Sequence, residues 1–278
     1  LSFVSSCGHC RLCSAGKQQL CEVHHSANSV QSDGTLRLHD GEQQLYQMHK
    51  LGVFSEYIVA PEQSCYPIPD EVSMEVAALI GCSVTTGVGT VINCPVSKPG
   101  MTVAVFGCGG VGLNVIQGAM MAGAEPIIAV DILDNKLELS KQFGATHTVN
   151  SSQVDPVKAI QELTDGQGTH YAFEAIGLVS DPFKQSILCT RKRGVTVYVG
   201  HAPVNTPVDF DARILFLEKT VIGSFYGTCR PRVDFPRLLA LYKAGKLKLD
   251  ELVTRIYPLE EVNEAFTALS QALMSCQA

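Results

Sequence analysis

One stretch of the sequence, residues 102–131, constrains the fold more than any other. It begins with an apolar, β-branched run at 102–106 and continues with Gly-Cys-Gly-Gly-Val-Gly at 107–112. A helical stretch and a second apolar run follow, and the second run ends at Asp131. The pattern G-x-G-x-x-G alone is weak evidence. The order strand, glycine loop, helix, strand and acid is typical of a dinucleotide-binding βαβ unit.

The glycines of this loop have separate roles in such a unit. Gly107 permits the tight turn, Gly109 lets the backbone approach a pyrophosphate, and Gly112 lets the helix pack closely on the strand. The N–H groups and the positive dipole end of the helix then face the phosphates. We therefore expect the phosphates of a dinucleotide to bind at Gly107, Gly109, Gly110, Val111 and Gly112.

The acid that ends the second apolar run predicts which dinucleotide is bound. Asp131 lies 19 residues beyond Gly112, where a carboxylate accepts a hydrogen bond from the ribose 2′-hydroxyl. A 2′-phosphate would meet like charge there, so NAD is favoured over NADP. Lys136, five residues further on, is a second candidate for contact with the ribose or adenine. The alternative role for Asp131 is the N-cap of the helix that follows its strand.

Strand-like and helical segments continue to alternate after Asp131, which predicts an α/β fold with a doubly wound parallel (Rossmann) sheet. Ligands bind such sheets at the carboxyl ends of the strands, where the strand order reverses. Gly177 and Gly200 end strands, so their backbones are candidates to line this crevice, and Ile176 beside Gly177 is a candidate for cofactor contact. The further strands are expected at 146–149, 171–176, 195–199 and 220–224, and helices at 113–122, 156–163, 182–189, 235–244 and 259–269.

Four cysteines near the start of the chain form the second informative pattern. Cys7, Cys10, Cys13 and Cys21 have the spacing C-x2-C-x2-C-x7-C. Four thiolates on a tight, glycine-containing loop suit a tetrahedral Zn²⁺ site of the closed, structural kind. An iron–sulfur cluster suits the first three spacings, and a group of buried or disulfide-bonded cysteines is the remaining alternative. Arg11, Lys17 and backbone N–H groups are candidates to stabilise the negative charge of such a centre.

Composition excludes several classes of protein. Hydrophobic residues make up 46% of 278 residues and charged residues 17%, which excludes a disordered chain. The formal net charge is -6 and no basic patch stands out, which argues against a nucleic-acid partner. Two uncharged stretches, 76–97 and 101–124, are long enough to span a membrane, but their glycines and hydroxyl residues favour buried strand-plus-helix segments. Clustered thiols and the lack of an apolar leader favour a soluble, cytoplasmic protein.

Together these motifs resemble the zinc-dependent, medium-chain alcohol dehydrogenase family. The resemblance rests on four features in family order: the four-cysteine lobe 7–21, Gly-Cys-Ser-Val-Thr-Thr-Gly at 81–87, the glycine loop with Asp131, and Gly-Lys-Leu-Lys-Leu-Asp at 245–250 followed by Tyr-Pro-Leu-Glu-Glu-Val-Asn-Glu-Ala-Phe at 257–266. It implies hydride transfer between NAD and a small alcohol, aldehyde or ketone, and a homodimer or homotetramer formed through an edge strand of the nucleotide domain.

The resemblance also implies roles for particular residues. Cys82 is one ligand of a catalytic zinc, Thr86 lies near the nicotinamide, and Val199 and Gly200 contact it from strand ends. The family's other catalytic ligands, a Cys and a His, precede the structural-zinc lobe. The sequence begins at Leu1, six residues before that lobe, so we expect a fragment with an incomplete catalytic zinc site. Without the family pattern, Cys82 is more simply a buried thiol on an apolar helix.

Three segments follow from this interpretation: a partial, mostly β catalytic domain at 1–83, the NAD-binding domain at 84–226, and a return to the catalytic domain at 227–278. Three other functions remain open. The first is a non-catalytic NAD-binding and interaction module. The second is a thiol-adduct formaldehyde dehydrogenase of the same family. The third is a zinc-independent reductase of the superfamily, against which the four-cysteine lobe and Cys82 both count.

Overall fold

The computed structural model describes residues 1–23, 29–31, 33–93 and 99–274. Two compact units make up the chain. Unit 1 contains Leu1–Cys82, Arg230–Ala240 and Leu249–Ala278, and unit 2 contains Ser83–Cys229 and Leu241–Lys248.

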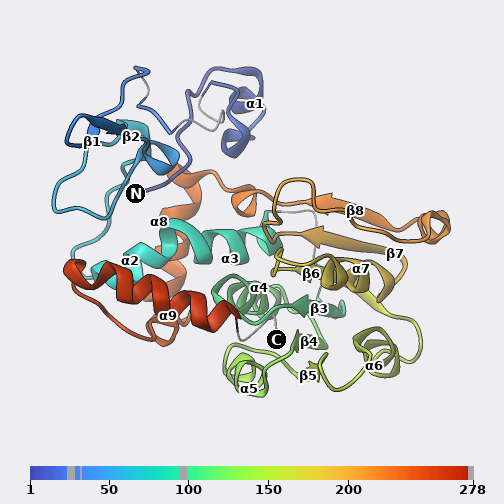
Figure 1. Cartoon of the computed structure of the whole chain (residues 1–278). Helices are drawn as coiled ribbons and strands as arrows, with labels where there is room; N and C mark the ends of the chain where they lie inside the picture. Colours follow the sequence, from blue (N-terminus) through green and yellow to red (C-terminus); the bar gives the residue numbers. More distant parts are fainter. Residues whose placement is uncertain (24–28, 32, 94–98, 275–278) are drawn as a thin grey trace. The chain divides into compact units, whose positions relative to one another are not determined.

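Unit 2 is built on a six-stranded parallel sheet with the order β5-β4-β3-β6-β7-β8 (Figure 1). The order reverses between β3 and β6, so the switch point lies where these two strands end. Strands β3 and β4 are buried throughout and almost wholly apolar, as expected for a sheet covered on both faces. The strands are β3 Val103–Phe106, β4 Ile127–Asp131, β5 His147–Asn150, β6 Thr169–Glu174, β7 Thr190–Tyr198 and β8 Thr220–Gly223.

Helices follow the strands of unit 2 in the alternating pattern that a doubly wound fold requires. Alternate residues of a strand face opposite sides of the sheet. Ala104 and Phe106 join a buried cluster with Ile160, while Val105 lies beneath the glycine-loop helix. The helices are α3 Thr85–Ile92, α4 Gly110–Met121, α5 Asp134–Gln142, α6 Pro156–Glu162 and α7 Ser180–Leu188, with short 3₁₀ turns at Ala212–Leu217 and Tyr226–Thr228.

The stretch 76–97 differs from the expected strand-plus-helix segment. Its described part lies in one continuous helix, Met74–Ile92, which is long and apolar enough to cross a membrane by length and composition alone. A core helix passes the same test, and residues 84–85 and 87–91 are buried. Gly87 has its Cα against Asn114 of α4, where a Cβ would lie 2.5 Å from the Asn114 Cβ. This close helix packing overrides the strand propensity of the valines and threonines.

A short segment from the C-terminal part of the sequence belongs to unit 2. The side-chain amide of Gln117 donates to the Lys248 carbonyl at 3.2 Å and accepts from the Lys248 N–H at 2.7 Å. The Lys248 ammonium donates to the Gln142 carbonyl at 2.6 Å. These bonds attach residues 241–248 to α4 and α5, an arrangement that the sequence pattern did not indicate.

Unit 1 has little regular structure apart from its helices. Its only described sheet is a hairpin of β1 Leu38–Asp40 and β2 Gln43–Leu45. The turn follows Asp40 at Gly41, whose φ of 59° is in the left-handed region. The helices are α1 Arg11–Ser14, α2 Met74–Leu79, α8 Pro231–Lys243 and α9 Val262–Met274, with 3₁₀ turns at Gln18–Leu20, Met48–Lys50, Glu62–Ser64, Asp250–Leu252 and Leu259–Glu261.

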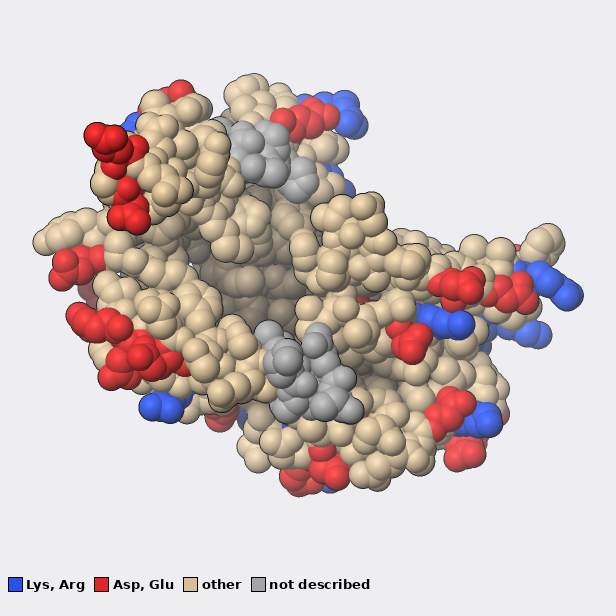
Figure 2. Space-filling model, viewed as in Figure 1, with Lys and Arg blue, Asp and Glu red and all other residues tan. Residues whose placement is uncertain are grey.

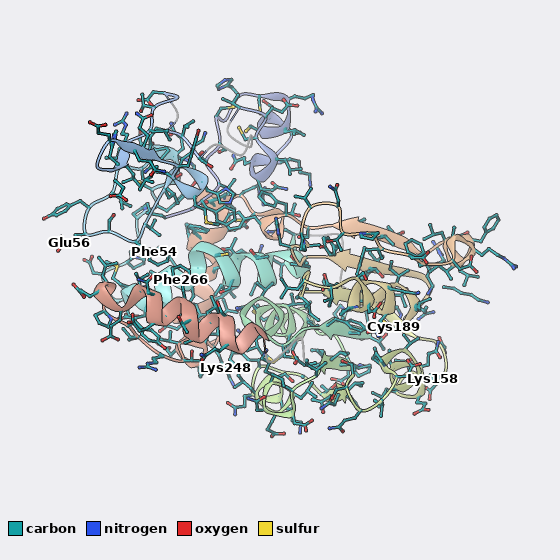
Figure 3. All side chains as sticks on the ribbon, viewed as in Figure 1. Phe54, Glu56, Lys158, Cys189, Lys248 and Phe266 are labelled. Atoms are coloured by element: carbon teal, nitrogen blue, oxygen red, sulfur yellow. The ribbon has the colours of Figure 1, made fainter. Side chains whose placement is uncertain are left out.

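Aromatic pairs join distant parts of the sequence within unit 1. Phe54 meets Phe266 of α9 edge to face, with ring centroids 5.3 Å apart (Figure 3). Tyr66 meets Phe235 of α8 in the same way at 5.0 Å. Such pairs stabilise by about 1 kcal/mol beyond the burial of their area. They show how the residues after unit 2 return to pack on the N-terminal part of the sequence.

Charge is distributed without a dominant sign on the exposed side of unit 2. On the face visible in Figure 2, the acidic and basic side chains of this unit are interspersed. All four ion pairs among the described residues join partners that are well exposed to solvent, so screening leaves each of them a small contribution to stability.

Candidate dinucleotide-binding and metal sites

The glycine loop of unit 2 has the tight geometry that the sequence predicts. Gly107 follows β3 with a φ of 93°, and its N–H donates to the Val130 carbonyl at 2.8 Å. A Cβ on Gly112 would overlap the Gly107 carbonyl oxygen and lie 2.8 Å from its carbon. A Cβ on Gly109 would meet nothing within 4 Å. The loop is therefore closed toward the sheet and open at Gly109, as a cradle for an approaching ligand requires.

The helix that starts at this loop offers backbone donors. α4 begins at Gly110, and its N-cap Gly109 has no side chain with which to cap it. Both glycines are exposed. An uncapped helix N-terminus combines donor N–H groups with a partial positive charge, which suits an anion. The residues of this loop fit the pyrophosphate of a dinucleotide.

Asp131 ends β4 beside the loop, and it is 7% exposed. One carboxylate oxygen accepts from the Cys108 N–H at 2.8 Å, and the other accepts from Ile132 and Leu133 at 2.8 and 3.1 Å. The N-cap of α5 is Leu133, so Asp131 is not the N-cap of the helix that follows its strand. A carboxylate has about four acceptor positions, and three are occupied by backbone donors. Capacity for one further donor, such as a ribose hydroxyl, remains.

The other predicted cofactor residues also belong to unit 2. Val199 and Gly200 follow β7, and Ile176 follows β6. Their backbones lie together, because a Cβ on Gly200 would be 2.6 Å from the Gly177 Cα. Lys136 is half-buried in the first turn of α5. Thr86 is half-buried in α3, one helix that packs directly on α4.

Glu174 is a functional candidate that sequence reasoning missed. It is the last residue of β6, at the switch point, and is fully buried. Burial raises the pKa of its carboxyl group, whereas hydrogen bonds from the N–H groups of Gly177 and Ile176 and the nearby N–H of Gly200 lower it. The available signal was an acid inside an otherwise apolar strand directly before a glycine turn.

The four cysteines of the lobe converge on one point in unit 1. The Sγ atoms of Cys7, Cys10, Cys13 and Cys21 all lie within 4.8 Å of one another, and those of Cys7 and Cys13 are 3.9 Å apart. Four ligands at about 2.3 Å from a tetrahedral zinc are about 3.8 Å apart. The donor set therefore fits zinc. The structure forms no disulfide among its described cysteines.

Backbone N–H groups stabilise the sulfurs. Cys7 N–H donates to Cys21 Sγ and Cys10 N–H to Cys7 Sγ, both at 3.3 Å, and Cys13 N–H donates to Cys10 Sγ at 3.5 Å. Backbone donors from Cys13 and Glu22 lower the pKa of Cys10 to about 6. Burial raises the pKa of Cys13 to about 12. A metal that binds here must therefore displace a proton from Cys13, so its affinity depends on pH.

The basic residues suggested for this centre are arranged differently. The Arg11 guanidinium pairs with Glu22 at 2.8 Å and its side chain is 77% exposed. Lys50, from a later segment, is instead the buried cation near the cluster. Burial lowers the pKa of Lys50, and the charge of neighbouring Cys21 raises it. Its carbonyl accepts from the buried Gln31 amide at 3.1 Å, which fixes this turn. Of the histidines close to the lobe in sequence, His9 is exposed, and His24 and His25 lie outside the described residues.

Cys82 lies in a π-helical turn, Ile80–Val84, and is exposed rather than buried. Such turns often occur at functional sites. A catalytic zinc needs three protein ligands. Among the residues that the structure describes, only the four-cysteine lobe gathers three or more metal-ligating side chains. The described residues therefore do not fit a complete catalytic zinc site around Cys82.

These features define an α/β protein with a glycine loop that fits a dinucleotide and a cluster of four cysteines that fits a metal ion, and comparison with known proteins gives its family. Residues 110–244 match the family model described as zinc-binding dehydrogenase, and residues 1–70 match the alcohol dehydrogenase GroES-like domain. The chain belongs to the zinc-dependent, medium-chain alcohol dehydrogenase family and is an oxidoreductase. The family predicted from the sequence motifs is confirmed.

Individual relatives are similar over almost the whole sequence. The chain is 38% identical to the NDMA-dependent alcohol dehydrogenase of Amycolatopsis methanolica, over 96% of this chain and 73% of the relative. It is 36% identical to alcohol dehydrogenase B of Mycobacterium tuberculosis, over 96% of this chain and 72% of the relative. The structure of benzyl alcohol dehydrogenase from Acinetobacter calcoaceticus matches with a TM-score of 0.86 and 31% identity, covering 96% and 74% of the two chains.

Proposed function

We propose that this chain binds NAD and transfers a hydride between it and a small alcohol, aldehyde or ketone. The observation that carries the proposal is the glycine loop: open at Gly109, followed by an uncapped helix N-terminus and flanked by the buried carboxylate of Asp131. The carboxylate favours NAD over NADP, since a 2′-phosphate would meet its charge.

The residues of unit 2 have distinct roles in this proposal. Gly109, Gly110 and Val111 present backbone donors to the pyrophosphate, Asp131 accepts from the ribose, and Lys136 lies on the adenine side. Ile176, Val199 and Gly200 contact the nicotinamide, and Thr86 orients it from α3. Bound NAD supplies a carbon that accepts the hydride, and the protein's part is to hold that carbon in position.

The four-cysteine lobe is proposed to hold a structural zinc, because four thiolates leave no position open for substrate. Cys82 is proposed as a ligand of a catalytic zinc by family pattern alone. The described residues do not complete that site.

Cofactor titration tests the proposal directly. The chain has no tryptophan, so calorimetry or the fluorescence of NADH itself is the suitable readout. We expect NAD to bind more tightly than NADP, and Asp131→Asn to weaken NAD binding about tenfold and reduce the preference. Asp165→Asn is the matched control, because Asp165 is exposed in a turn with a φ of 51°, which Asn tolerates. Absence of NAD binding, or equal affinity of both variants, would contradict the proposal.

Two further properties are proposed by family resemblance. β8 is an edge strand that pairs only with β7 in the described sheet and is mostly exposed, so it suits pairing between copies in a homodimer or homotetramer. The location is proposed to be cytoplasmic, in keeping with reduced thiols.

A non-catalytic NAD-binding module is the second candidate, favoured by the incomplete ligand set around Cys82. Alcohol turnover with NAD by the purified chain, lost in Cys82→Ala but kept in Cys65→Ala, would exclude it. A thiol-adduct formaldehyde dehydrogenase is separated from both by turnover that requires a thiol together with formaldehyde.

A further inference from the structure

Glu174 occupies the centre of the switch point in unit 2. In the sheet register it lies beside Phe106, the last residue of β3, and beside Tyr198, the last residue of β7. It is 0% exposed. A buried carboxyl at the carboxyl edge of a parallel sheet is costly unless it is hydrogen-bonded. Its contacts therefore indicate what the residue does there.

Both the side chain and the backbone of Glu174 hold turns that follow strands. Its Oε1 accepts from the N–H groups of Ile176 and Gly177, each at 2.8 Å. Its carbonyl accepts from Val199 and Gly200, each at 2.9 Å. One residue thus fixes the two turns to which the nicotinamide contacts are assigned.

The two turns are packed too closely to hold their positions independently. A Cβ on Gly177 would lie 2.6 Å from the Gly200 carbonyl carbon, and a Cβ on Gly200 would lie 2.6 Å from Glu174 Oε2. A Cβ on Gly107 would lie 2.6 Å from Ile176 Cγ1. A movement of the 176–177 turn would therefore reach both the 200 turn and the phosphate loop.

The second carboxyl oxygen carries no bond. Glu174 Oε2 is buried and has no hydrogen-bond partner among the described atoms. An ionised carboxylate with an orphaned oxygen is strongly disfavoured, and burial correspondingly raises the pKa of the group. A neutral side chain of the same shape, such as glutamine, would keep the Oε1 contacts without a buried charge.

We propose that Glu174 is a positioning residue for the nicotinamide half of the dinucleotide, acting through the Ile176–Gly177 and Val199–Gly200 turns. The inference rests on the proposed NAD-binding function. It predicts a specific defect: loss of the Oε1 acceptor disturbs the nicotinamide end of the site and leaves the adenosine diphosphate end intact.

The test compares NAD⁺ with ADP-ribose, which lacks the nicotinamide. Calorimetric affinities are measured for the full chain and for Glu174→Met, which fills the volume but removes the acceptor. We expect Glu174→Met to weaken NAD⁺ binding about tenfold while ADP-ribose affinity stays within about twofold of the unsubstituted chain. Glu174→Gln retains the acceptor and should restore most of the NAD⁺ affinity.

Two controls make each outcome decisive. Thr196→Val removes a buried hydrogen bond from β7 to the Ser186 carbonyl, 3.1 Å long, and should change neither affinity. If Glu174→Met lost affinity for NAD⁺ and for ADP-ribose equally, or lost affinity for neither, the positioning role would be overturned. Failure of the unsubstituted chain to bind either ligand would instead contradict the proposed function. If Glu174→Met does not fold, a Glu174→Gln protein that binds NAD⁺ about tenfold more weakly than the unsubstituted chain would also overturn the inference.

Discussion

Two glycines of the phosphate loop should respond in opposite ways to the addition of a single methyl group. In Gly109→Ala the methyl enters open space on a backbone with φ of -78° and ψ of -173°, which alanine adopts. Alanine is a poorer N-cap than glycine, but it lowers the entropy of the unfolded chain. These effects nearly cancel, so the free energy of unfolding should change by less than about 0.5 kcal/mol.

In Gly112→Ala the methyl overlaps the Gly107 carbonyl and lies 2.8 Å from its carbon. The obstacle is backbone, so the loop must move, at a cost near the upper end of overpacking, about 3 kcal/mol. Alanine's better helix propensity returns about 1 kcal/mol within α4. The net destabilisation should be about 2 kcal/mol, which corresponds to a fall in Tm of about 5 °C.

Thermal unfolding by circular dichroism and calorimetric titration of NAD⁺ should separate the two variants. Gly109→Ala should keep the Tm of the unsubstituted chain and lose about tenfold or more in NAD⁺ affinity, because its methyl occupies space assigned to the pyrophosphate. Gly112→Ala should lower both the Tm and the NAD⁺ affinity. Normal NAD⁺ binding by Gly109→Ala, or an unchanged Tm for Gly112→Ala, would refute the reasoning.

Two further predictions concern buried ionisable groups and the metal. Since the pKa of folded Glu174 is raised above its ordinary value of 4.5, the folded state keeps a proton that the unfolded chain releases. The protonated Glu174 carboxyl therefore makes its full contribution to the free energy of unfolding below pH 4.5. This contribution is lost as the pH rises through the raised pKa of the folded state. The Tm of Glu174→Gln minus the Tm of the unsubstituted chain should therefore increase as the pH rises above 4.5. A Tm difference that does not change with pH would contradict this prediction. For the lobe, Cys21→Ser should lower the zinc bound per chain and the Tm, whereas Cys65→Ser, at an exposed cysteine outside the cluster, should alter neither. Equal zinc contents would show that the cluster is not the metal site.

The alternating fold of unit 2 was predictable because its signals are local. A buried parallel strand is a short apolar run, and the glycine loop marks the start of its helix. Thr190–Tyr198 is longer than its expected strand, since Arg191, Lys192 and Arg193 break the apolar pattern although they continue the strand. Residues 76–92 were harder to assign. Their valines and threonines favour strand, whereas the close packing of Gly87 on α4 and of Gly89 on Gly227 favours the helix.

In the candidate sites too, features with a local sequence signal were predictable and features that depend on distant contacts were not. The spacing of the cysteines predicted that their sulfurs meet, because a tight loop brings nearby residues together. No local signal indicates that Lys50, 29 residues beyond Cys21, supplies the buried charge beside them, or that Glu174 joins two turns. Such arrangements depend on which segments become neighbours in the fold, and no local sequence pattern predicts that.

Asp131 illustrates why a binding residue and a structural residue need not be alternatives. Its carboxylate accepts three backbone N–H groups, and one of these belongs to Cys108 within the glycine loop. Charge-assisted bonds of this kind contribute about 1.5–3 kcal/mol each, so Asp131 holds the loop in shape before any ligand arrives. The same three hydrogen bonds fix the orientation of the carboxylate, so its remaining acceptor position points in a defined direction. A ribose hydroxyl that binds there meets a preorganised group and incurs little additional ordering cost. Asp131 can therefore serve both the fold and cofactor choice.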